Sequence, residues 1–469
     1  MRGQTLLILI AGFSAGCTVG PNYTRPNTAV PAAFRAPEPL PPAEAASIAD
    51  LKWFEVFKDE KLQELIRTAL QQNYDLREAV ARVEQARAGL GIVRSNQFPQ
   101  FGAGGSVEIN RLSRDGETPI PAELLPNQNR NFGSAALQLL SFEVDIWGKL
   151  RRATEAARAN LLNAEENRKA VVTTLVSDVA TAYLTLRELD YTLQISQETL
   201  ETRRQSLVLT KQRQTGGVST LLDLRQAEQL VYTADETIPT IQQQIEQTEN
   251  RITLLLGENP GSIARGRSLT EQAFPPEVPA GLSSSLLERR PDIRAAEQGL
   301  IAANAQIGVA RAAYFPEVSL SGFLGGQSTQ LSSLFSGPHS AWSLVPQVTQ
   351  PIFTAGRLKS NVQLAKAERD QALVEYQQTI QTAFTEVSDA LIAHQRRRES
   401  REKQQALVGT LEDRKRLAYL RYRGGVDTQL NALDADRDLF QAQLDLAQIR
   451  LEDILTVVQL YKALGGGWQ

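Results

Sequence analysis

Two short sequences, Thr215-Gly-Gly-Val-Ser-Thr220 and Arg423-Gly-Gly-Val-Asp-Thr428, decide the fold of this 469-residue chain. Each places a glycine pair, Gly216-Gly217 or Gly424-Gly425, in a stretch that otherwise has the composition of a long helix. Glycine adopts the backbone conformations of a tight reversal without a steric penalty. The two copies lie 208 residues apart. The sequence therefore predicts one long helical hairpin that is used twice.

The arms of both predicted hairpins are long because helix-breaking residues are rare in them. No proline occurs in 148–213 or in 356–423. An α-helix rises ~1.5 Å per residue, so each of these arms predicts a helix on the order of 100 Å long. The complete hairpins are predicted over 148–257 and 356–465, and Pro239 predicts a kink or a packing adjustment in the first returning arm.

A pair of strands is predicted before each helical hairpin. Proline ends a helix after Phe98 and after Phe315. Residues 99–146 and 316–354 then alternate apolar and polar side chains around a polar loop, which predicts two β-hairpins. The aromatic residues of these segments are candidates either for a lipid-facing wall with its aromatic girdles or for the core of a small soluble sheet: Phe101, Phe132, Phe323, Phe335 and Trp342.

The order helix, β-hairpin and long helical hairpin thus occurs twice. The first repeat is predicted over 51–257, a connector over 258–282, and the second repeat over 283–465. Four strands cannot close a barrel, and open sheet edges cannot face lipid. If the strands enter a membrane, two chains would supply eight strands and three would supply twelve, and both are even numbers typical of outer-membrane barrels.

The N-terminus has the pattern of a bacterial secretory signal. A basic residue and a short apolar run precede Ser14-Ala-Gly-Cys17, which resembles a lipobox. Residues 1–16 are therefore predicted to be a removed signal peptide, with covalent lipid on Cys17. An ordinary signal peptide with an incidental cysteine is the alternative. Residues 17–50 are rich in proline, which predicts an extended strap.

Composition excludes several classes of function. The net charge of −3 gives no global basic signal for nucleic acid. With one Cys and two His residues, no His/Cys metal cluster can form within one chain. The sequence also lacks a glycine-rich phosphate loop and a nucleophile elbow. We therefore expect no enzymatic activity, no metal, no cofactor other than the lipid, and no nucleic-acid partner.

Four features together carry a resemblance to a known family. They are the segment Cys17–Pro26, the segment Arg289–Glu297 (Arg-Arg-Pro-Asp-Ile-Arg-Ala-Ala-Glu), the paired Phe-Pro junctions and the two Gly-Gly-Val reversals. In their order and duplication the chain resembles the lipoprotein branch of the TolC-like outer membrane factor family. The resemblance implies a mostly α-helical homotrimer, whose 12-stranded outer-membrane β-barrel continues into a long periplasmic α-helical barrel.

The resemblance also implies partners and a location. Such proteins are exit ducts of tripartite resistance-nodulation-division pumps, which contain a periplasmic adaptor and an inner-membrane transporter. Thr18 after the lipidated Cys17 suggests sorting to the outer membrane, where the lipid anchors the chain. We expect passive conduction of small toxic compounds or drugs. Peptide or protein secretion is an alternative, and a third is an envelope coiled-coil scaffold without a pore, which would have no use for the β-hairpins.

In this family the periplasmic end closes at the hairpin tips, where acidic residues ring the aperture. A threefold ring of like charges repels anions and concentrates cations. Helix capping is the alternative explanation for each acidic residue, and Asp427 is well placed as an N-cap. We expect the second hairpin to carry most of the charged latch. The gate candidates are Asp223, Asp427, Asp434, Arg213, Arg421, Tyr422 and Arg423.

One histidine stands in a repeated helical stripe. His394 occupies the position that corresponds, 208 residues later, to Leu186. A packed or interface histidine and a proton sensor are the two interpretations of this residue.

Overall fold

The computed structural model divides the chain into two compact units, and each unit combines segments from both predicted repeats. Unit 1 contains the chain up to Pro26 together with Glu84–Asn163 and Ala296–Glu375, and unit 2 contains Asn27–Val83, Ala164–Ala295 and Tyr376–Gln469. The described residues are 18–28, 31, 33–36, 47–111, 113, 121, 123, 128–272 and 283–468.

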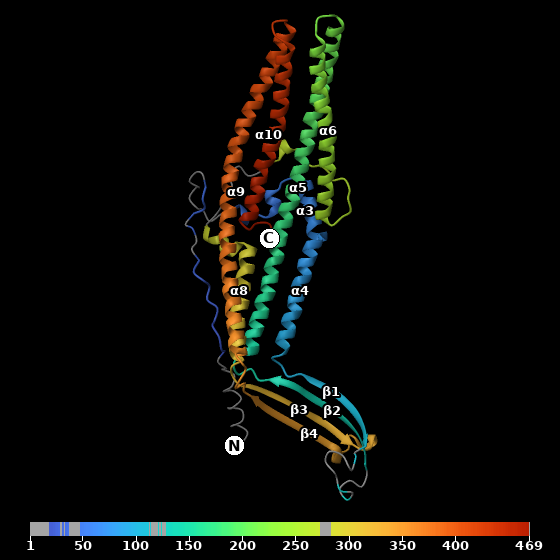
Figure 1. Cartoon of the computed structure of the whole chain (residues 1–469), viewed down its shortest axis with the longest axis vertical. Helices are drawn as coiled ribbons and strands as arrows, with labels where there is room; N and C mark the ends of the chain where they lie inside the picture. The colour runs from blue at the N-terminus through green and yellow to red at the C-terminus, as the bar shows by residue number, and fades with distance from the viewer. Residues whose placement is uncertain are drawn as a thin grey trace. The chain divides into compact units, whose positions relative to one another are not determined.

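Unit 1 contains one antiparallel four-stranded sheet in the order β1-β2-β3-β4 (Figure 1). The strands are β1 (Phe101–Arg111), β2 (Asn129–Glu143), β3 (Glu317–Ser328) and β4 (Ser340–Thr349). The two predicted β-hairpins are thus confirmed, and pairing of β2 with β3 joins them into a single sheet. A bulge shifts this pairing between Leu139 and Phe142.

The strand register gives the sheet one apolar and one polar face, because directly opposite residues on paired strands share a face. One face carries the apolar residues Phe101, Val107, Ile109, Leu137, Leu139, Leu324, Trp342, Leu344 and Val348. The other face carries the polar residues Ser106, Glu108, Ser134, Gln138, Ser321, Gln327, Ser343 and Gln347.

The aromatic candidates divide between these faces and a loop. Phe101 and Trp342 lie on the apolar face, as a lipid-facing wall requires. Phe323 is paired with Gln138, and Phe132 is two residues from Ser134, so both belong to the polar face. The strand register therefore separates these two from Phe101 and Trp342, and their position toward lipid stays a prediction. Phe335 lies in the connection between β3 and β4.

Of the strap predicted over 17–50, residues 18–26 of unit 1 form no helix or strand, as predicted, whereas residues 48–50 form the short 3-10 helix η1. Residues 17, 29–30, 32 and 37–46 of the predicted strap lie outside the described residues. The segment 18–26 packs on α8 (Pro291–Ala312) and on the start of α5. Tyr23 and Arg25 both donate hydrogen bonds to the Glu297 carboxylate. Gly20, at φ 110°, lies so close to Gly308 that a Cβ atom on Gly20 would be 2.5 Å from the Gly308 Cα.

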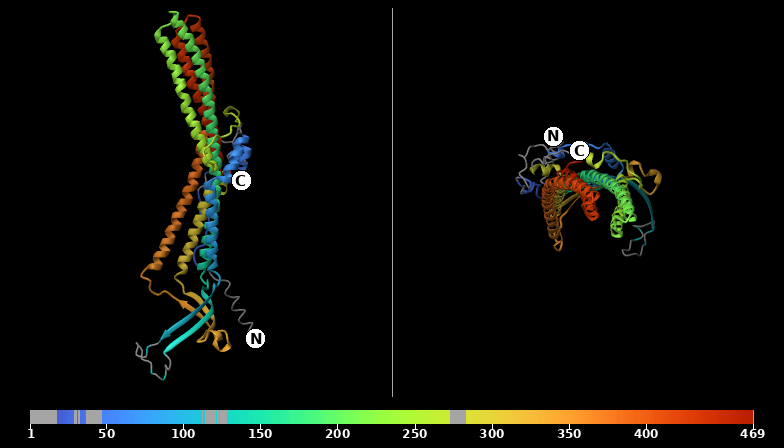
Figure 2. Two further views of the ribbon diagram at one scale, coloured as in Figure 1. Left: turned by 90° about the vertical axis from the view of Figure 1, so that its right-hand side faces the viewer. Right: turned by 90° about the horizontal axis from the view of Figure 1, so that it is seen from above.

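Both predicted helical hairpins are present (Figure 1). The first consists of α5 (Lys149–Thr215) and α6 (Leu221–Leu256), and the second of α9 (Arg357–Arg423) and α10 (Gln429–Ala463). In unit 2 the two hairpins lie side by side and are joined by direct hydrogen bonds (Figure 2). Pro239 lies inside α6, which continues to Leu256, so the kink stays a prediction.

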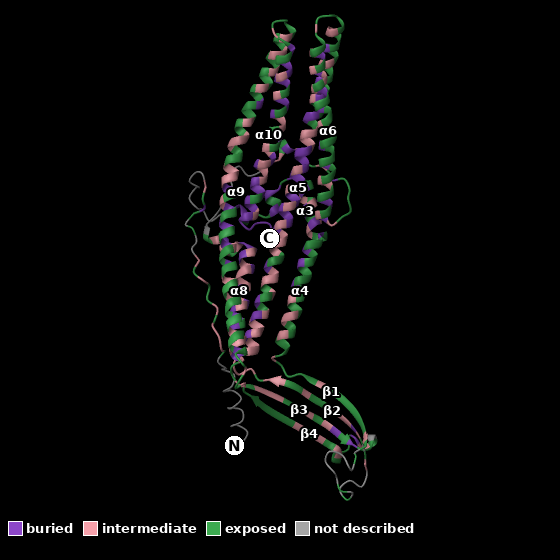
Figure 3. Ribbon diagram, in the orientation of Figure 1, coloured by how far each residue is buried: buried purple, intermediate pink, exposed green. Residues whose placement is uncertain are grey.

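The core of unit 2 includes the helical stripe that contains Leu186. Val176, Val179, Tyr183 and Leu186 of α5 are almost completely buried. Figure 3 colours the elements by burial and shows buried stretches on α5. Within the described part of the chain, no helix is long and apolar enough to cross a membrane. The remaining elements are η1 (Ile48–Asp50), α2 (Trp53–Val56), α3 (Glu60–Gln72), α4 (Tyr74–Ser95), η2 (Leu269–Glu271), η3 (Ser283–Ser285), α7 (Leu286–Arg289), η4 (Leu331–Ser333) and η5 (Gly337–His339).

Candidate functional site at the hairpin tips

The two Gly-Gly turns have the same backbone structure. The Val218 N–H donates to the Arg213 carbonyl over 2.9 Å, and the Val426 N–H donates to the Arg421 carbonyl over 3.1 Å. In each turn the second glycine adopts a left-handed conformation, with φ 74° at Gly217 and 73° at Gly425. A side chain is strained in that region, which explains why glycine stands at both positions. The predicted hairpin-tip turns are therefore present at both places.

Asp223 caps a helix at the first tip. Its carboxylate accepts hydrogen bonds from the Thr220 N–H over 2.8 Å and from the Ser219 hydroxyl over 3.0 Å. The Asp223 N–H in turn donates to the Thr220 hydroxyl, which completes a capping box at the start of α6. The hydrogen bonds from Thr220 lower the pKa of Asp223 below its ordinary value. These contacts favour the capping explanation for this residue.

Asp427 forms an ion pair at the second tip. It accepts hydrogen bonds from Arg421 Nε over 3.0 Å, from the Asn431 amide over 2.6 Å and from the Thr428 N–H over 2.8 Å. The helix begins one residue later than an N-cap at Asp427 requires, because Thr428 is the N-cap of α10. The N-cap interpretation of Asp427 is therefore wrong. Hydrogen bonds from Arg421 and Asn431 lower the pKa of Asp427.

Side chains of the two hairpins meet near the tips. The Arg213 guanidinium of α5 lies 5.0 Å from the centre of the Tyr422 ring of α9. The Gln429 amide of α10 donates to the Thr210 hydroxyl over 2.8 Å and accepts from the Tyr422 hydroxyl over 3.2 Å. Asp434 instead pairs with Arg437 of its own helix at 3.0 Å.

Arg423, the remaining gate candidate, lines a groove near the tips. The groove lies between α5 and α9 and has a volume of about 600 Å³. Arg423 lines it together with Lys415, Arg416 and the acidic Glu412. Tyr419 and Tyr422 supply aromatic walls, and burial raises the pKa of the Tyr419 hydroxyl.

A buried ionic contact was missed by sequence reasoning. The Asp436 carboxylate of α10 is 1% exposed and accepts a hydrogen bond from Arg203 Nε of α5 over 2.7 Å. Lys415 Nζ of α9 lies 2.5 Å from its other oxygen. Asp436 lies three residues after Leu433 and four before Phe440, both of which are buried. An acidic residue at such a position on an apolar helix face is the sequence feature that could have indicated a buried ion pair. We call Arg203, Lys415 and Asp436 the interhairpin clamp.

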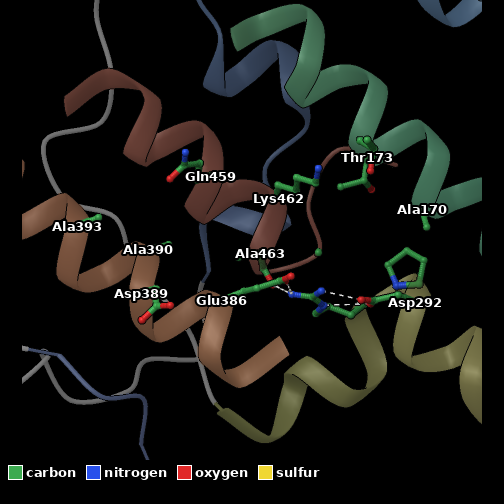
Figure 4. A pocket seen from close by; sticks show the side chains of 14 residues that line it. Ala170, Thr173, Asp292, Glu386, Asp389, Ala390, Ala393, Gln459, Lys462 and Ala463 are labelled. Carbon is green, nitrogen blue, oxygen red and sulfur yellow. Dashed lines mark hydrogen bonds and ion pairs between the residues drawn. The ribbon is translucent and has the colours of Figure 1, made fainter. Parts of the chain in front are cut away.

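The Arg-Arg-Pro-Asp-Ile-Arg motif forms a second ionic centre in unit 2 (Figure 4). Arg290 precedes α8 and pairs with Asp292 at 2.6 Å and with Glu386 of α9 at 2.7 Å. It also donates to the Ala463 carbonyl at the end of α10 over 2.9 Å. One guanidinium therefore ties the end of α10 to the start of α8, beside a pocket of about 570 Å³.

Comparison with known proteins decides the family. The model of the family described as outer membrane efflux protein matches residues 65–258 and 282–466. The chain belongs to the outer membrane efflux protein family. Family membership explains the paired helical hairpins, because both are contained in the matched segments. It also confirms the prediction that the chain is not an enzyme, since the family consists of outer-membrane channels for efflux.

Full-length relatives support the same assignment. The probable efflux pump outer membrane protein TtgC of Pseudomonas putida is 39% identical over 469 residues, covering 98% of this chain and 95% of the relative. The cation efflux system protein CusC of Escherichia coli O157:H7 is 35% identical and covers 97% and 96%. This outer membrane efflux protein is therefore the outer-membrane component of an efflux system.

Solved structures of outer-membrane channels share the fold. The outer-membrane channel OprN superposes with a TM-score of 0.87 at 32% identity, covering 96% of this chain and all of that chain. The Campylobacter jejuni CmeC channel gives a TM-score of 0.88 at 28% identity, covering 96% and 95%. The predicted fold of long helical hairpins with a small membrane sheet, its outer-membrane location and its role in efflux are confirmed.

Proposed function

We propose that three copies of this chain form the passive exit duct of a tripartite efflux pump. The observation that carries the proposal is the sheet, with its apolar face and its polar face. Among the described strands, β1 and β4 are the edges and pair on one side only. Sheet edges cannot stay unpaired in hydrocarbon. Further copies must therefore complete the wall, with the apolar face toward lipid and the polar face toward a water-filled lumen.

The number of strands favours three copies over two. Two copies would supply eight strands, and an eight-stranded barrel has an interior just wide enough for side chains or one small ligand. Three copies would supply twelve strands and leave room for a continuous aqueous passage. Of these two assemblies, only the homotrimer is wide enough to serve as a duct.

The cargo that fits such a passage is a small toxic compound. Relatives are named for toluene efflux and for cation efflux, which are chemically unlike cargoes. A wide lumen lined by serine and glutamine need not recognise what passes through it. Selection of cargo therefore belongs to an inner-membrane transporter, which delivers its substrate to this chain through a periplasmic adaptor.

The hairpin tips are the surface that we assign to the adaptor. Apolar side chains are exposed in and beside both turns, although isolated water-exposed tips would favour polar residues. These side chains are Val218, Leu221, Leu222, Val426 and Leu430. We also assign the closed gate to these tips, through the ion pair of Arg421 with Asp427 and the contact of Arg213 with Tyr422. Asp223, Asp434 and Arg423 remain candidates for the charge that faces the aperture.

A lipid on Cys17 would anchor the chain in the outer membrane. Cys17 and the predicted signal peptide lie outside the described residues. The neighbouring strap supports the proposal, because the Val19 N–H donates to the Trp147 carbonyl close to the end of β2. Intact-mass spectrometry of the mature chain tests it. The expected mass corresponds to a triacylated N-terminal Cys17, and an unmodified thiol would contradict it.

The duct is tested by a pair of neighbouring substitutions on opposite faces of β3. We expect Leu324→Lys to abolish the heat-modifiable trimer on gels, because a lysine facing lipid costs ~2–4 kcal/mol near the middle of the bilayer. Phe323→Lys places the same charge in the lumen and should keep both the trimer and its conductance in planar lipid bilayers. An elongated monomer without conductance, or equal effects of both substitutions, would reject the duct in favour of a scaffold.

A further inference from the structure

A pocket of unit 2 lies where α10 ends and α8 begins. Its volume is about 570 Å³, which lies within the ~300–1,000 Å³ range of small-molecule sites. Segments of α5, α9 and α10 and the start of α8 form its walls (Figure 4). We call this space the junction pocket. Small residues in its walls leave the space open, namely Ala170, Ala390, Ala393, Ala463 and Gly465.

One group of charges in the junction pocket is already paired. The Arg290 guanidinium is 9% exposed and forms ion pairs with Asp292 at 2.6 Å and with Glu386 at 2.7 Å. It also donates a hydrogen bond to the Ala463 carbonyl over 2.9 Å. An anion that approached this guanidinium would meet the carboxylates of Asp292 and Glu386, which repel it. Arg290 is therefore part of the wall of the pocket and not a free cation for a ligand.

Two further charges in the same pocket have no ionic partner within the described part of the chain. Lys462, which is half-buried, extends from the last turn of α10 toward Thr173 of α5 (Figure 4). Asp389 is exposed and belongs to another wall of the pocket, formed by α9. A site with one free ammonium and one free carboxylate complements a molecule that carries the two opposite groups.

A buried hydroxyl in the wall beside Lys462 also lacks a partner. Thr173 is 6% exposed, and its Oγ1 has no hydrogen-bond partner among the described residues. Native proteins pair most of their buried polar groups, because an unpaired one is unfavourable. A carboxylate bound by Lys462 would supply the acceptor that the Thr173 hydroxyl lacks. The anionic group of a ligand therefore fits between α5 and α10, and its cationic group fits at Asp389 of α9.

We propose that the junction pocket binds a small zwitterion with an apolar body, of the class of short peptides with free termini. Lys462 binds the terminal carboxylate, and Asp389 binds the terminal ammonium. The alanine side chains of the walls contact the apolar body, and the volume is larger than a single amino acid requires. This site goes beyond the proposed function, because none of the gate candidates lines it and binding requires no conduction.

Isothermal titration calorimetry of the purified full-length protein in detergent tests the proposal, with the dipeptide leucyl-leucine as the probe. We expect saturable binding at one site per chain. Two analogues report the two charges: leucyl-leucinamide lacks the carboxylate, and N-acetyl-leucyl-leucine lacks the ammonium. Each analogue should bind roughly tenfold more weakly than the dipeptide, because each loses one charge-assisted hydrogen bond. Equal affinities for the dipeptide and both analogues, or no saturable binding of the dipeptide, would overturn the proposal.

Two substitutions assign the charges of the probe to residues. Lys462→Met should weaken binding of the dipeptide roughly tenfold and leave binding of leucyl-leucinamide unchanged, since that analogue has no carboxylate to lose. Asp389→Asn should show the same pattern with the N-acetyl analogue. Lys403→Met is the matched control, because it removes an exposed lysine of α9 outside the pocket and should bind the dipeptide as the wild type does.

The pattern across probes and variants decides the outcome. Equal weakening of the dipeptide and of leucyl-leucinamide by Lys462→Met would contradict the assigned role of this lysine, as would an equal loss in Lys403→Met. The two analogues test the same charges on the unsubstituted protein, so the proposal stays open to disproof even where a variant does not fold.

Discussion

At the scale of single residues, Asp59 shows how one carboxylate fixes a connector. The side chain is 2% exposed. Its oxygens accept hydrogen bonds from five groups: the N–H groups of Lys61, Leu62 and Arg267, the Tyr183 hydroxyl and the Gln272 amide. Burial raises the pKa of Asp59, but hydrogen bonds led by those of Gln272 and Tyr183 outweigh it, so the pKa is lowered. The carboxylate therefore stabilises the folded state in its charged form.

This arrangement predicts a pH-dependent effect of Asp59→Asn. A lowered folded-state pKa gives stability that is present above the unfolded-state value of about 3.9 and is lost as the pH falls below it. At pH 7 the variant should lose about 2 kcal/mol, because an amide cannot accept all five hydrogen bonds. Thermal unfolding followed by circular dichroism should show a difference that shrinks toward pH 3. Glu60→Gln, at the adjacent exposed position, is the control, and a difference independent of pH would contradict the prediction.

His394 illustrates a residue whose role the surroundings decide. Its Nδ1 lies 2.9 Å from the Thr456 hydroxyl. Burial lowers the pKa of His394, and the nearby Asp453 opposes that shift only in part, because the net pKa is lowered. The imidazole is therefore neutral near pH 7, which supports the packed interpretation over the proton sensor. The sequence could place His394 on the stripe but could not tell which groups of α10 face it.

At the scale of elements, the two helical hairpins have the same turn but different helix starts. In the first hairpin the Thr220 side chain accepts from the Asp223 N–H over 3.1 Å. In the second, the equivalent Thr428 makes no side-chain cap among the described residues. Asp427, Arg421 and Asn431 instead form a polar cluster before the helix. The acidic residue of the first tip thus takes part in a helix cap, whereas that of the second tip takes part in an ion pair, and the charged latch of the second hairpin stays a prediction.

This difference between the hairpins predicts unequal effects of two equivalent substitutions. Thr220→Ala removes a helix cap, which typically costs about 1 kcal/mol. Amide exchange of the first turn of α6, measured by mass spectrometry, should therefore accelerate by roughly fivefold. Thr428→Ala removes no cap and should leave the exchange of the first turn of α10 unchanged. Equal acceleration of amide exchange in the first turns of α6 and α10 would show that the Thr220 cap does not stabilise its helix more than Thr428 stabilises its own.

At the scale of the whole molecule, each compact unit is built from both halves of the sequence. Arg290 holds one such junction, since it bridges α8, α9 and the end of α10. The sequence motif marked this residue as part of a family pattern. It did not show the role of the guanidinium, because the partners Glu386 and Ala463 are distant along the chain.

Arg290→Met should lower the stability of this outer membrane efflux protein by about 2 kcal/mol, since a charge-assisted hydrogen bond to a helix end is lost. Its ion partners are half exposed and can be hydrated, which limits the loss. The control is Arg289→Met. Arg289 pairs with Asp50 at 2.8 Å in a partly exposed contact, whose loss should cost under about 1 kcal/mol. Thermal unfolding of purified protein compares the two variants, and equal losses would contradict the role of Arg290.

The sequence by itself determined the elements of this protein, because they depend on local chemistry. Glycine pairs mark the turns, proline ends the helices, and alternation marks the strands. The tertiary structure decided which face of the sheet each strand residue lies on and which helix residues contact distant segments. Strand register placed Phe132 and Phe323 on the polar face. Burial among four helices turned Asp436 into an ionic link 233 residues away from Arg203. Such contacts form between segments that are distant along the chain, and the periodicity of a sequence does not predict which segments meet. The two Gly-Gly turns, by contrast, depend only on their own residues.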